Sequence, residues 1–213
     1  MRNDADCTFN GWLRNGGTAP LKIVMEGSAT QTFADGSGAF NFSGGVEVRS
    51  GTIAFNGRDT YSAQSHGTLT MNGGTFKIIA AGATSSGSFG FTDMQYKGGT
   101  IALNINNSAA DIINLTAGTI VAVEGMADYV EFNITGNLDL LVDNYTKIVS
   151  WTAASAIAEN KYRANDYGAL TAAFDVRDDG LYVSYVPEPA EWAAIFGALA
   201  LGLAVYRRRT KRN

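Results

Sequence analysis

Hydrophobic and polar residues alternate over short stretches along most of the chain. A period of two places alternate side chains on the same face of a β-strand, so one face of each stretch is predicted to point into a core. The stretches are separated by glycine, asparagine and other turn-forming residues. We therefore expect an all-β body whose interior includes Leu69, Phe76, Ile101, Leu103, Val130, Phe132 and Leu140.

A Gly-Thr pair opens six of the segments: "GGTAPL", "SGTIAF", "HGTLTM", "GGTFKI", "GGTIAL" and "AGTIVA". Glycine permits the turn, and the β-branched threonine favours the strand that follows. The threonines, at positions 18, 52, 68, 75, 100 and 119, are separated by 34, 16, 7, 25 and 19 residues. Short strands at such intervals fit an antiparallel sandwich or a β-solenoid.

We favour an irregular parallel β-solenoid, or β-helix, because its coils tolerate variable length. Asn-rich and Gly-rich stretches such as "NINNSAADIINLTAG" would form its bends. Strands near 170–176 and 181–186 flank "RDDG", which predicts a C-terminal hairpin that closes the last coil. The Ala-rich residues 153–158 fit either one or two helical turns or a loop.

The C-terminal tail has a different pattern, with 15 uncharged residues from Trp192 to Tyr206. A helix of this length covers roughly 22 Å, against about 30 Å of membrane hydrocarbon. Trp192 and Tyr206 suit the two membrane interfaces, and Arg207, Arg208 and Arg209 would face the cytoplasm. The tail therefore predicts a single transmembrane α-helix, and a buried core helix is the alternative.

Two prolines stand just before this apolar run, in the sequence Pro187-Glu188-Pro189. Each proline fixes its own φ and pushes the preceding residue toward an extended conformation. The last strand should therefore stop here and leave an extended tripeptide exposed outside the membrane. Such a segment is accessible to a processing enzyme.

These three parts, in this order, resemble the PEP-CTERM sorting signal. The resemblance implies that exosortase, a membrane transpeptidase-like enzyme of bacteria, recognises Pro187, Glu188 and Pro189 and removes the tail. The stretches "AADIINLTAGTIVAV", "YVEFNITGNLDLLVDNYTKIVSW" and "FDVRDDGLYVSYVPEP" resemble the C-terminal part of autotransporter-passenger-like β-helical proteins. The resemblance thus implies a membrane-anchored precursor in the cell envelope that is delivered to the cell surface or extracellular matrix.

The N-terminus departs from that family pattern. Its first residues, "MRNDADCTFNGWLRNGGTAP", contain charges and glycines but lack the apolar core of a secretory signal peptide. A truncated or misplaced start would explain this. We divide the chain into residues 1–44, a solenoid start or truncated region, residues 45–185, the solenoid body, and residues 186–213, the sorting signal.

Charge and composition limit the chemistry of the body. Residues 1–206 carry 11 basic and 20 acidic side chains, a net charge of −9, which disfavours binding to nucleic acid. Cys7 and His66 are the only residues of their types, so no internal disulfide or cysteine-based metal site is predicted. We interpret His66 as a solvated turn residue and predict no cofactor. Asp175, Asp178 and Asp179 lack the spacing of a calcium loop.

Three functions fit these features. We favour a structural or adhesive surface protein that is not an enzyme, with weak polysaccharide contacts through residues such as Tyr61, Tyr96 and Asn56. A carbohydrate-active β-helix enzyme would need clustered charges, and the nearest candidates, Arg58, Asp59 and Lys97, share no motif. The third possibility is a tail-anchored membrane protein that is never processed.

Overall fold

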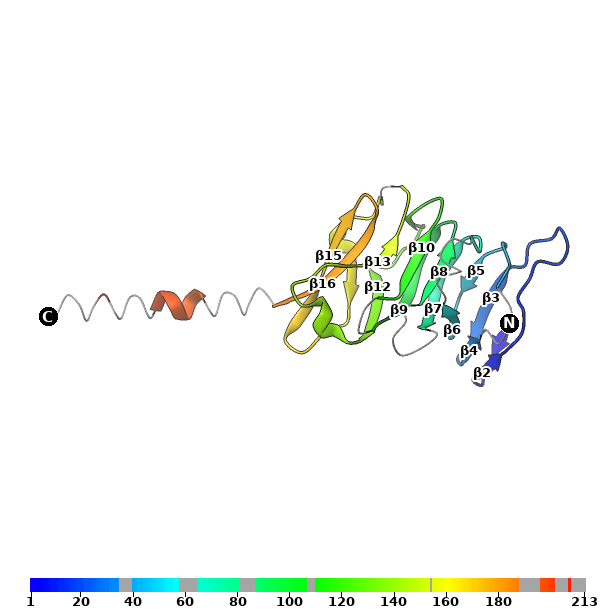
Figure 1. Ribbon diagram of the computed structural model, residues 1–213, viewed down its shortest axis with the longest axis horizontal. Helices are drawn as coiled ribbons and strands as arrows, with labels where there is room; N and C mark the ends of the chain where they lie inside the picture. Colours follow the sequence, from blue (N-terminus) through cyan, green and yellow to red (C-terminus); the bar gives the residue numbers. More distant parts are fainter. Residues whose placement is uncertain are drawn as a thin grey trace.

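The computed structural model of the chain describes residues 1–34, 40–57, 65–80, 87–106, 110–153, 155–187, 196–201 and 207. Its regular structure is mainly β-strand, and strands of successive coils pair in parallel. Figure 1 shows the strands following one another along the long axis, from the N-terminal strands to the hairpin at the other end. The predicted parallel β-solenoid is confirmed.

Three stacks of strands form the walls of the solenoid. The first wall consists of β1 (Arg2–Asn3), β3 (Ile23–Gly27), β5 (Val46–Val48), the beginnings of β7 (Leu69–Ala80) and β9 (Met94–Ile105), and β11 (Ile120–Ala122). The second wall consists of β2 (Cys7–Phe9), β4 (Thr30–Phe33), β6 (Thr52–Gly57), the ends of β7 and β9, β12 (Val130–Gly136) and β14 (Tyr162–Ala164). Strands β7 and β9 thus continue around the corner between these two walls.

The third wall is the five-stranded sheet at the C-terminal end. It contains β8 (Ser88–Phe91), β10 (Ile112–Leu115), β13 (Thr146–Ser150), β16 (Gly180–Pro187) and β15 (Leu170–Arg177). Toward the N-terminus the same wall continues as segments that are not strands, which are held by backbone hydrogen bonds. The His66 N–H donates to the Gly90 carbonyl, and the Gly45 N–H donates to the His66 carbonyl. The N-terminal residues 1–44 thus contribute β1–β4 to the same stack.

The Gly-Thr pairs stack in register at the corner between the first and second walls. Thr52 pairs with Thr75 and Thr75 with Thr100, at intervals of 23 and 25 residues. Gly74 and Gly99 have φ values of 60° and 103°, which favour glycine. A Cβ on Gly99 would lie 2.6 Å from the Gly74 carbonyl oxygen. Glycine therefore allows the backbones of successive coils to approach closely here.

Other Gly-Thr pairs mark a different corner. Thr68 and Thr119 immediately precede β7 and β11, so they introduce strands of the first wall. The predicted strand directly after Thr18 is wrong, because Thr18 lies in a turn and β3 starts at Ile23. The irregular spacing in the sequence therefore arises because one motif is used at two corners of the coil.

The interior between the walls is filled by the alternating apolar side chains. Those of Leu69, Phe76, Ile101, Leu103, Val130 and Phe132 are buried, as predicted. Stacked phenylalanines run through the N-terminal half, with ring centroids 4.9 Å apart for Phe33 and Phe55 and 4.9 Å for Phe55 and Phe89. Aromatic pairs at such distances add to the free energy gained by burying their surface.

The prediction for Leu140 is wrong, because its side chain is 39% exposed. The segment expected to form a strand is a 3₁₀ helix, η2 (Leu138–Leu141). A 3₁₀ helix has three residues per turn, so residues three apart share a face. Leu138 and Leu141 are accordingly buried, and Leu140 points outward.

A buried carboxylate fastens the bend between β9 and β10. Asp111 is fully buried, and its two oxygens accept hydrogen bonds from the backbone N–H groups of Gly87 (2.6 Å) and Asn104 (2.8 Å). Burial raises the pKa of Asp111 to about 6, although both hydrogen bonds favour the ionised form. Asp111 thus ties together two coils at an Asn-rich bend of the predicted kind.

His66 is also inside, which corrects its interpretation as a solvated residue. Its side chain is 1% exposed and packs against Phe89 and Phe42, with centroid distances of 4.3 and 4.8 Å. Its Nδ1 lies 2.7 Å from the Gly90 carbonyl oxygen and its Nε2 3.1 Å from that of Phe40. His66 thus contacts backbone carbonyls of two other coils, and its neutral ring can donate to one of them. Burial lowers its pKa, although hydrogen bonds to both carbonyls favour the charged form.

The C-terminal hairpin is confirmed. Strands β15 and β16 pair antiparallel around the two-residue turn Asp178–Asp179, and β16 also pairs antiparallel with β13. The Trp151 indole N–H donates to the Arg177 carbonyl at 3.0 Å and ties the preceding segment to the hairpin. The described part of 153–158 is not helical, and a short 3₁₀ helix, η3 (Glu159–Lys161), follows it.

We predict that His66→Ala lowers the free energy of unfolding by about 2–4 kcal/mol, since it leaves a cavity and removes a buried hydrogen bond. Because folding favours neutral His66, the wild-type free energy of unfolding should contain a component that decreases as the pH falls below 6.5, the ordinary pKa of histidine. Denaturant titrations followed by circular dichroism at several pH values measure both effects.

The exposed neighbour Ser65 provides the control for this prediction. Ser65→Ala should cost less than about 1 kcal/mol and leave the pH dependence unchanged. An identical pH dependence in His66→Ala and the wild type would contradict the assignment of this component to His66.

Candidate functional site

The structure describes two of the predicted sorting and anchor residues. Pro187 is the last residue of β16, and Arg207 is exposed. The positions of Glu188, Pro189, Trp192, Tyr206, Arg208 and Arg209 lie outside the described residues. Residues 196–201 form a short exposed helix. Among the residues that the structure describes, no helix has the length and apolar character needed to cross a membrane.

The residues predicted to contact polysaccharide do not form one site. Tyr96 is fully buried, and its hydroxyl donates to the Gly99 carbonyl, so its predicted role as an exposed ligand is wrong. Asn56 lies in β6 and is partly exposed, whereas Tyr61 lies outside the described residues. Of the charged candidates for an enzyme site, Lys97 is exposed on β9, and Arg58 and Asp59 also lie outside the described residues.

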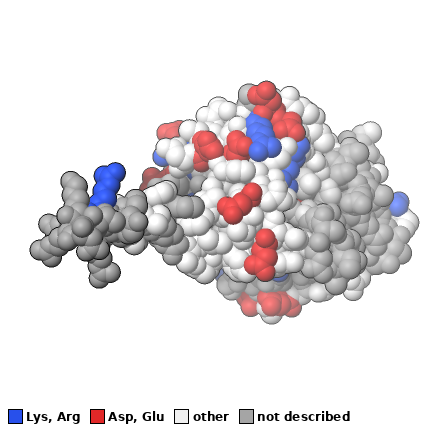
Figure 2. All heavy atoms as spheres, turned by 60° about the vertical axis from the view of Figure 1, so that its left-hand side comes forward, with Lys and Arg blue, Asp and Glu red and all other residues white. Residues whose placement is uncertain are grey.

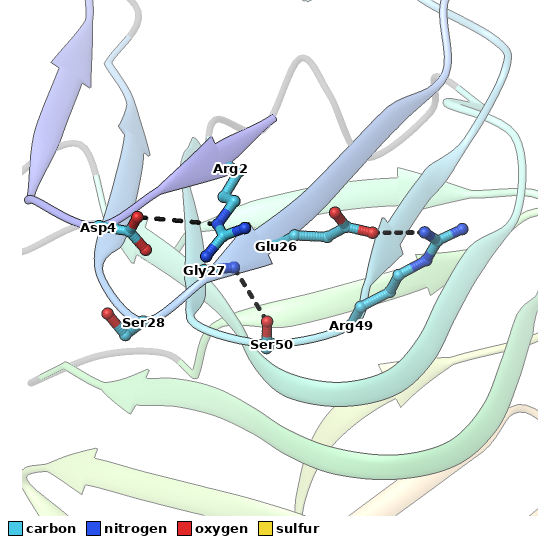
Figure 3. A pocket seen from close by; sticks show the side chains of 7 residues that line it. All are labelled: Arg2, Asp4, Glu26, Gly27, Ser28, Arg49 and Ser50. Atoms are coloured by element: carbon cyan, nitrogen blue, oxygen red, sulfur yellow. Dashed lines mark hydrogen bonds and ion pairs between the residues drawn. The ribbon is translucent and has the colours of Figure 1, made fainter.

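A charged groove of about 510 Å³ opens at the corner of the first coils, and we call it the N-terminal groove. Figure 3 shows its lining, in which Arg2 is paired with Asp4 (3.7 Å) and Arg49 with Glu26. The remaining lining residues are Gly27, Ser28 and Ser50, and the Ser50 hydroxyl accepts a hydrogen bond from the Gly27 N–H at 3.0 Å. The charges of this groove are therefore largely compensated within the protein.

An ion-pair network on the first wall extends from this groove. Glu47 is 6% exposed, and its carboxylate contacts Lys22 Nζ at 2.7 Å and Arg49 Nε at 2.6 Å. The Asn72 amide on the next coil donates to the same carboxylate at 3.1 Å. These partners, first the hydrogen bond from Arg49 and then that from Lys22, lower the pKa of Glu47 to about 2. The network therefore ties together three coils.

A second groove, of about 640 Å³, lies beside the closing hairpin, and we call it the C-terminal groove. Three segments line it: Tyr145 before β13, then Ala158, Glu159, Asn160 and Tyr162 in and beside η3, and Ala172, Ala173 and Phe174 of β15. Tyr145 is 40% exposed, whereas the Tyr162 and Phe174 rings are buried. The Tyr162 hydroxyl is 3.1 Å from that of Ser155, and burial raises its pKa to about 12. The groove thus combines aromatic and small apolar side chains with the exposed Glu159 and Asn160.

A cluster of tyrosines and cations borders the C-terminal groove. The Arg177 guanidinium lies 4.0 Å from the ring centroid of Tyr182 and 5.7 Å from that of Tyr145. Arg177 also pairs with Asp175 at 2.6 Å, and Lys147 pairs with Asp179. These cations are therefore already neutralised by neighbouring carboxylates.

Acidic side chains are dispersed over the face that includes this end of the molecule. Figure 2 shows them as separate clusters on a mostly uncharged surface, with basic side chains beside some of them. Within the described ranges, no group of three or more His, Cys, Asp or Glu side chains is arranged to hold a metal ion. A comparison of the chain with protein-family models and with curated proteins gives no match.

We predict that Glu47→Gln lowers the free energy of unfolding by about 1–3 kcal/mol at pH 7. Because folding lowers the pKa of Glu47 from 4.5 to about 2, its stabilisation is present above pH 4.5 and is lost as the pH falls toward 2. The difference between variant and wild type should therefore shrink over this range, as measured by urea unfolding.

Glu124, which is exposed, supplies the matched control. Glu124→Gln should change the free energy of unfolding by less than about 0.5 kcal/mol both at pH 7 and near pH 2. A difference between Glu47→Gln and the wild type that stays constant from pH 7 to pH 2 would contradict the proposed role of the ion pairs.

Proposed function

We propose that this chain is a structural or adhesive protein of the bacterial cell surface or extracellular matrix, and not an enzyme. In this proposal it is made as a membrane-anchored precursor and delivered through a PEP-CTERM signal. Exosortase is its processing partner, and extracellular polysaccharide is the polymer that it contacts. The sequence Pro187-Glu188-Pro189, followed by an uncharged apolar run and consecutive arginines, carries the proposal.

The solenoid is compatible with such a role. Each coil stacks on the one before it, so the body has an extended regular surface. A structural or adhesive role can use such a surface without a catalytic centre. The hairpin β15–β16 completes the stack, and Pro187 is the last residue of β16. A sorting segment that starts at Pro187 would therefore overlap the end of the last strand, where Pro187 pairs with Leu170 of β15.

The tail has the properties that a temporary anchor needs. In the proposal, residues 192–206 span the membrane, with Trp192 and Tyr206 at its interfaces and Arg207, Arg208 and Arg209 on the cytoplasmic side. Arginines can extend along their own apolar stems and compensate for a short span. Cleavage near the proline pair would release the solenoid with its core intact.

The proposal predicts that residues 190–213 are missing from the mature protein in a bacterium with exosortase. Pro187→Ala combined with Pro189→Ala should retain the full-length chain in the inner membrane, because the recognised tripeptide is lost while the apolar run remains. Intact mass spectrometry of the surface and membrane fractions measures this. The expressed chain should carry an added signal peptide so that export does not limit the result.

Two controls separate sorting from simple anchoring. Ala190→Ser leaves both prolines in place and should be processed like the wild type, and a strain without exosortase should accumulate the precursor. A full-length wild-type chain in both fractions would refute processing and indicate a permanent tail anchor. Release of the double proline variant at the wild-type mass would show that Pro187 and Pro189 are not the recognised residues.

A further inference from the structure

We propose that the C-terminal groove binds a neutral oligosaccharide and that Tyr145 supplies its main stacking surface. This inference rests on the proposed function for its biological setting. It adds to that function by assigning the contact with polysaccharide to one site. The volume of about 640 Å³ is in the range of small-molecule binding grooves. It is open to solvent at Tyr145, Glu159 and Asn160, which are exposed.

The chemistry of the lining matches the two kinds of surface that a pyranose ring presents. The faces of such a ring carry C–H groups, and its edge carries hydroxyl groups. Ala172 and Ala173 are partly exposed and lie on opposite faces of β15, with Ala172 against the core, and their single-carbon side chains leave space along this strand. Tyr145 adds an aromatic ring with an apolar face and a polar hydroxyl. Together these residues can pack against the C–H face of a sugar.

The polar groups lie where hydroxyl groups of a stacked sugar would need partners. Glu159 offers carboxylate oxygens that accept hydrogen bonds, and Asn160 offers both a donor and an acceptor. Both belong to the short 3₁₀ helix η3, which holds them at adjacent positions. A few polar groups around an apolar floor are typical of sites that orient a small ligand.

The charges around the groove favour a neutral ligand over an acidic one. Glu159 is the charged residue in the lining, so a carboxylate or sulfate group would be repelled there. The nearby cations do not offset this, because Arg177 pairs with Asp175 and Lys147 with Asp179. Lys161, in the same 3₁₀ helix, does not line the groove. The N-terminal groove lacks an aromatic lining and is filled by paired charges.

The test measures binding of named sugars to the full chain, kept in a detergent without a sugar head group. The neutral probes are cellohexaose, mannohexaose and maltohexaose, and the acidic probe is hexagalacturonate. Isothermal titration and saturation-transfer NMR should show saturable binding of at least one neutral probe, with a Kd of roughly 0.1–1 mM, and at least tenfold weaker binding of hexagalacturonate.

Substitutions locate the binding site. Tyr145→Ala should weaken binding about tenfold or more, and Ala173→Trp should abolish it by filling the groove. Glu159→Gln should weaken binding about threefold. Because Glu159 is exposed, this variant should fold normally and can test the site even if the other variants unfold. Tyr129→Ala is the matched control, because Tyr129 is 36% exposed and also lies beside cations, Arg163 (4.7 Å) and Lys161 (6.0 Å), but outside the groove. It should bind within twofold of the wild type.

Several results would overturn the inference. These are no binding of any neutral probe, equal binding of hexagalacturonate, or wild-type affinity in both Tyr145→Ala and Glu159→Gln. Failure of the sorting proposal is distinguishable, since that is scored by the mass of the surface fraction and not by sugar binding. A processed chain that binds none of the probes overturns only this inference, and a binding chain that is never processed overturns only the sorting proposal.

Discussion

Close backbone contact at the glycine corners is the constraint on which the rest of the solenoid depends. A side chain on Gly99 would collide with the Gly74 carbonyl of the preceding coil, so only glycine permits the observed stacking. Once these corners are fixed, Thr52, Thr75 and Thr100 pair in register. The inward residues that follow these threonines are then level with their counterparts in the next coil, as are Phe33 and Phe55, whose rings stack.

Buried polar side chains stabilise the bends by hydrogen bonding to the backbone, which apolar side chains cannot do. Asp111 accepts hydrogen bonds from the backbone N–H groups of Gly87 and Asn104, which the bend leaves without a strand partner. His66 lies against the carbonyls of Gly90 and Phe40 on the neighbouring coils. The titrations of Asp111 and His66 have opposite effects on stability. The folded chain holds a proton on Asp111 more tightly than the unfolded chain does, and it holds one on His66 less tightly. Acidification from pH 6 to 4 therefore stabilises one bend while it weakens the other contact.

The sequence was sufficient to predict most of the strands and of the core, because alternation depends only on local geometry. Val130 and Phe132 follow this rule directly. The rule failed at Leu140, where a 3₁₀ helix replaces the strand, and at Tyr96, which was treated as exposed although it lies two residues from Met94 on the inward face. His66 was misjudged because its partners, at Phe40 and Gly90, are distant in sequence.

The two grooves could not have been predicted from local patterns. Tyr145, Glu159 and Ala173 come from separate segments and carry no shared motif, so only the fold brings them together. The coil length was concealed for a related reason: Gly-Thr pairs serve two corners, so their spacing mixes two series. The intervals of 23 and 25 residues emerge once the pairs are sorted by the wall that they introduce.

The position of β16 also has a mechanical consequence. This strand is hydrogen-bonded on both sides, antiparallel to β13 and to β15, and it ends at Pro187, where the chain continues toward the tail. Tension applied to Pro187 along the axis of β16 loads these two ladders in shear, so that many hydrogen bonds resist together and do not open one after another. A force transmitted through the tail therefore reaches the coils behind the hairpin only through these two ladders.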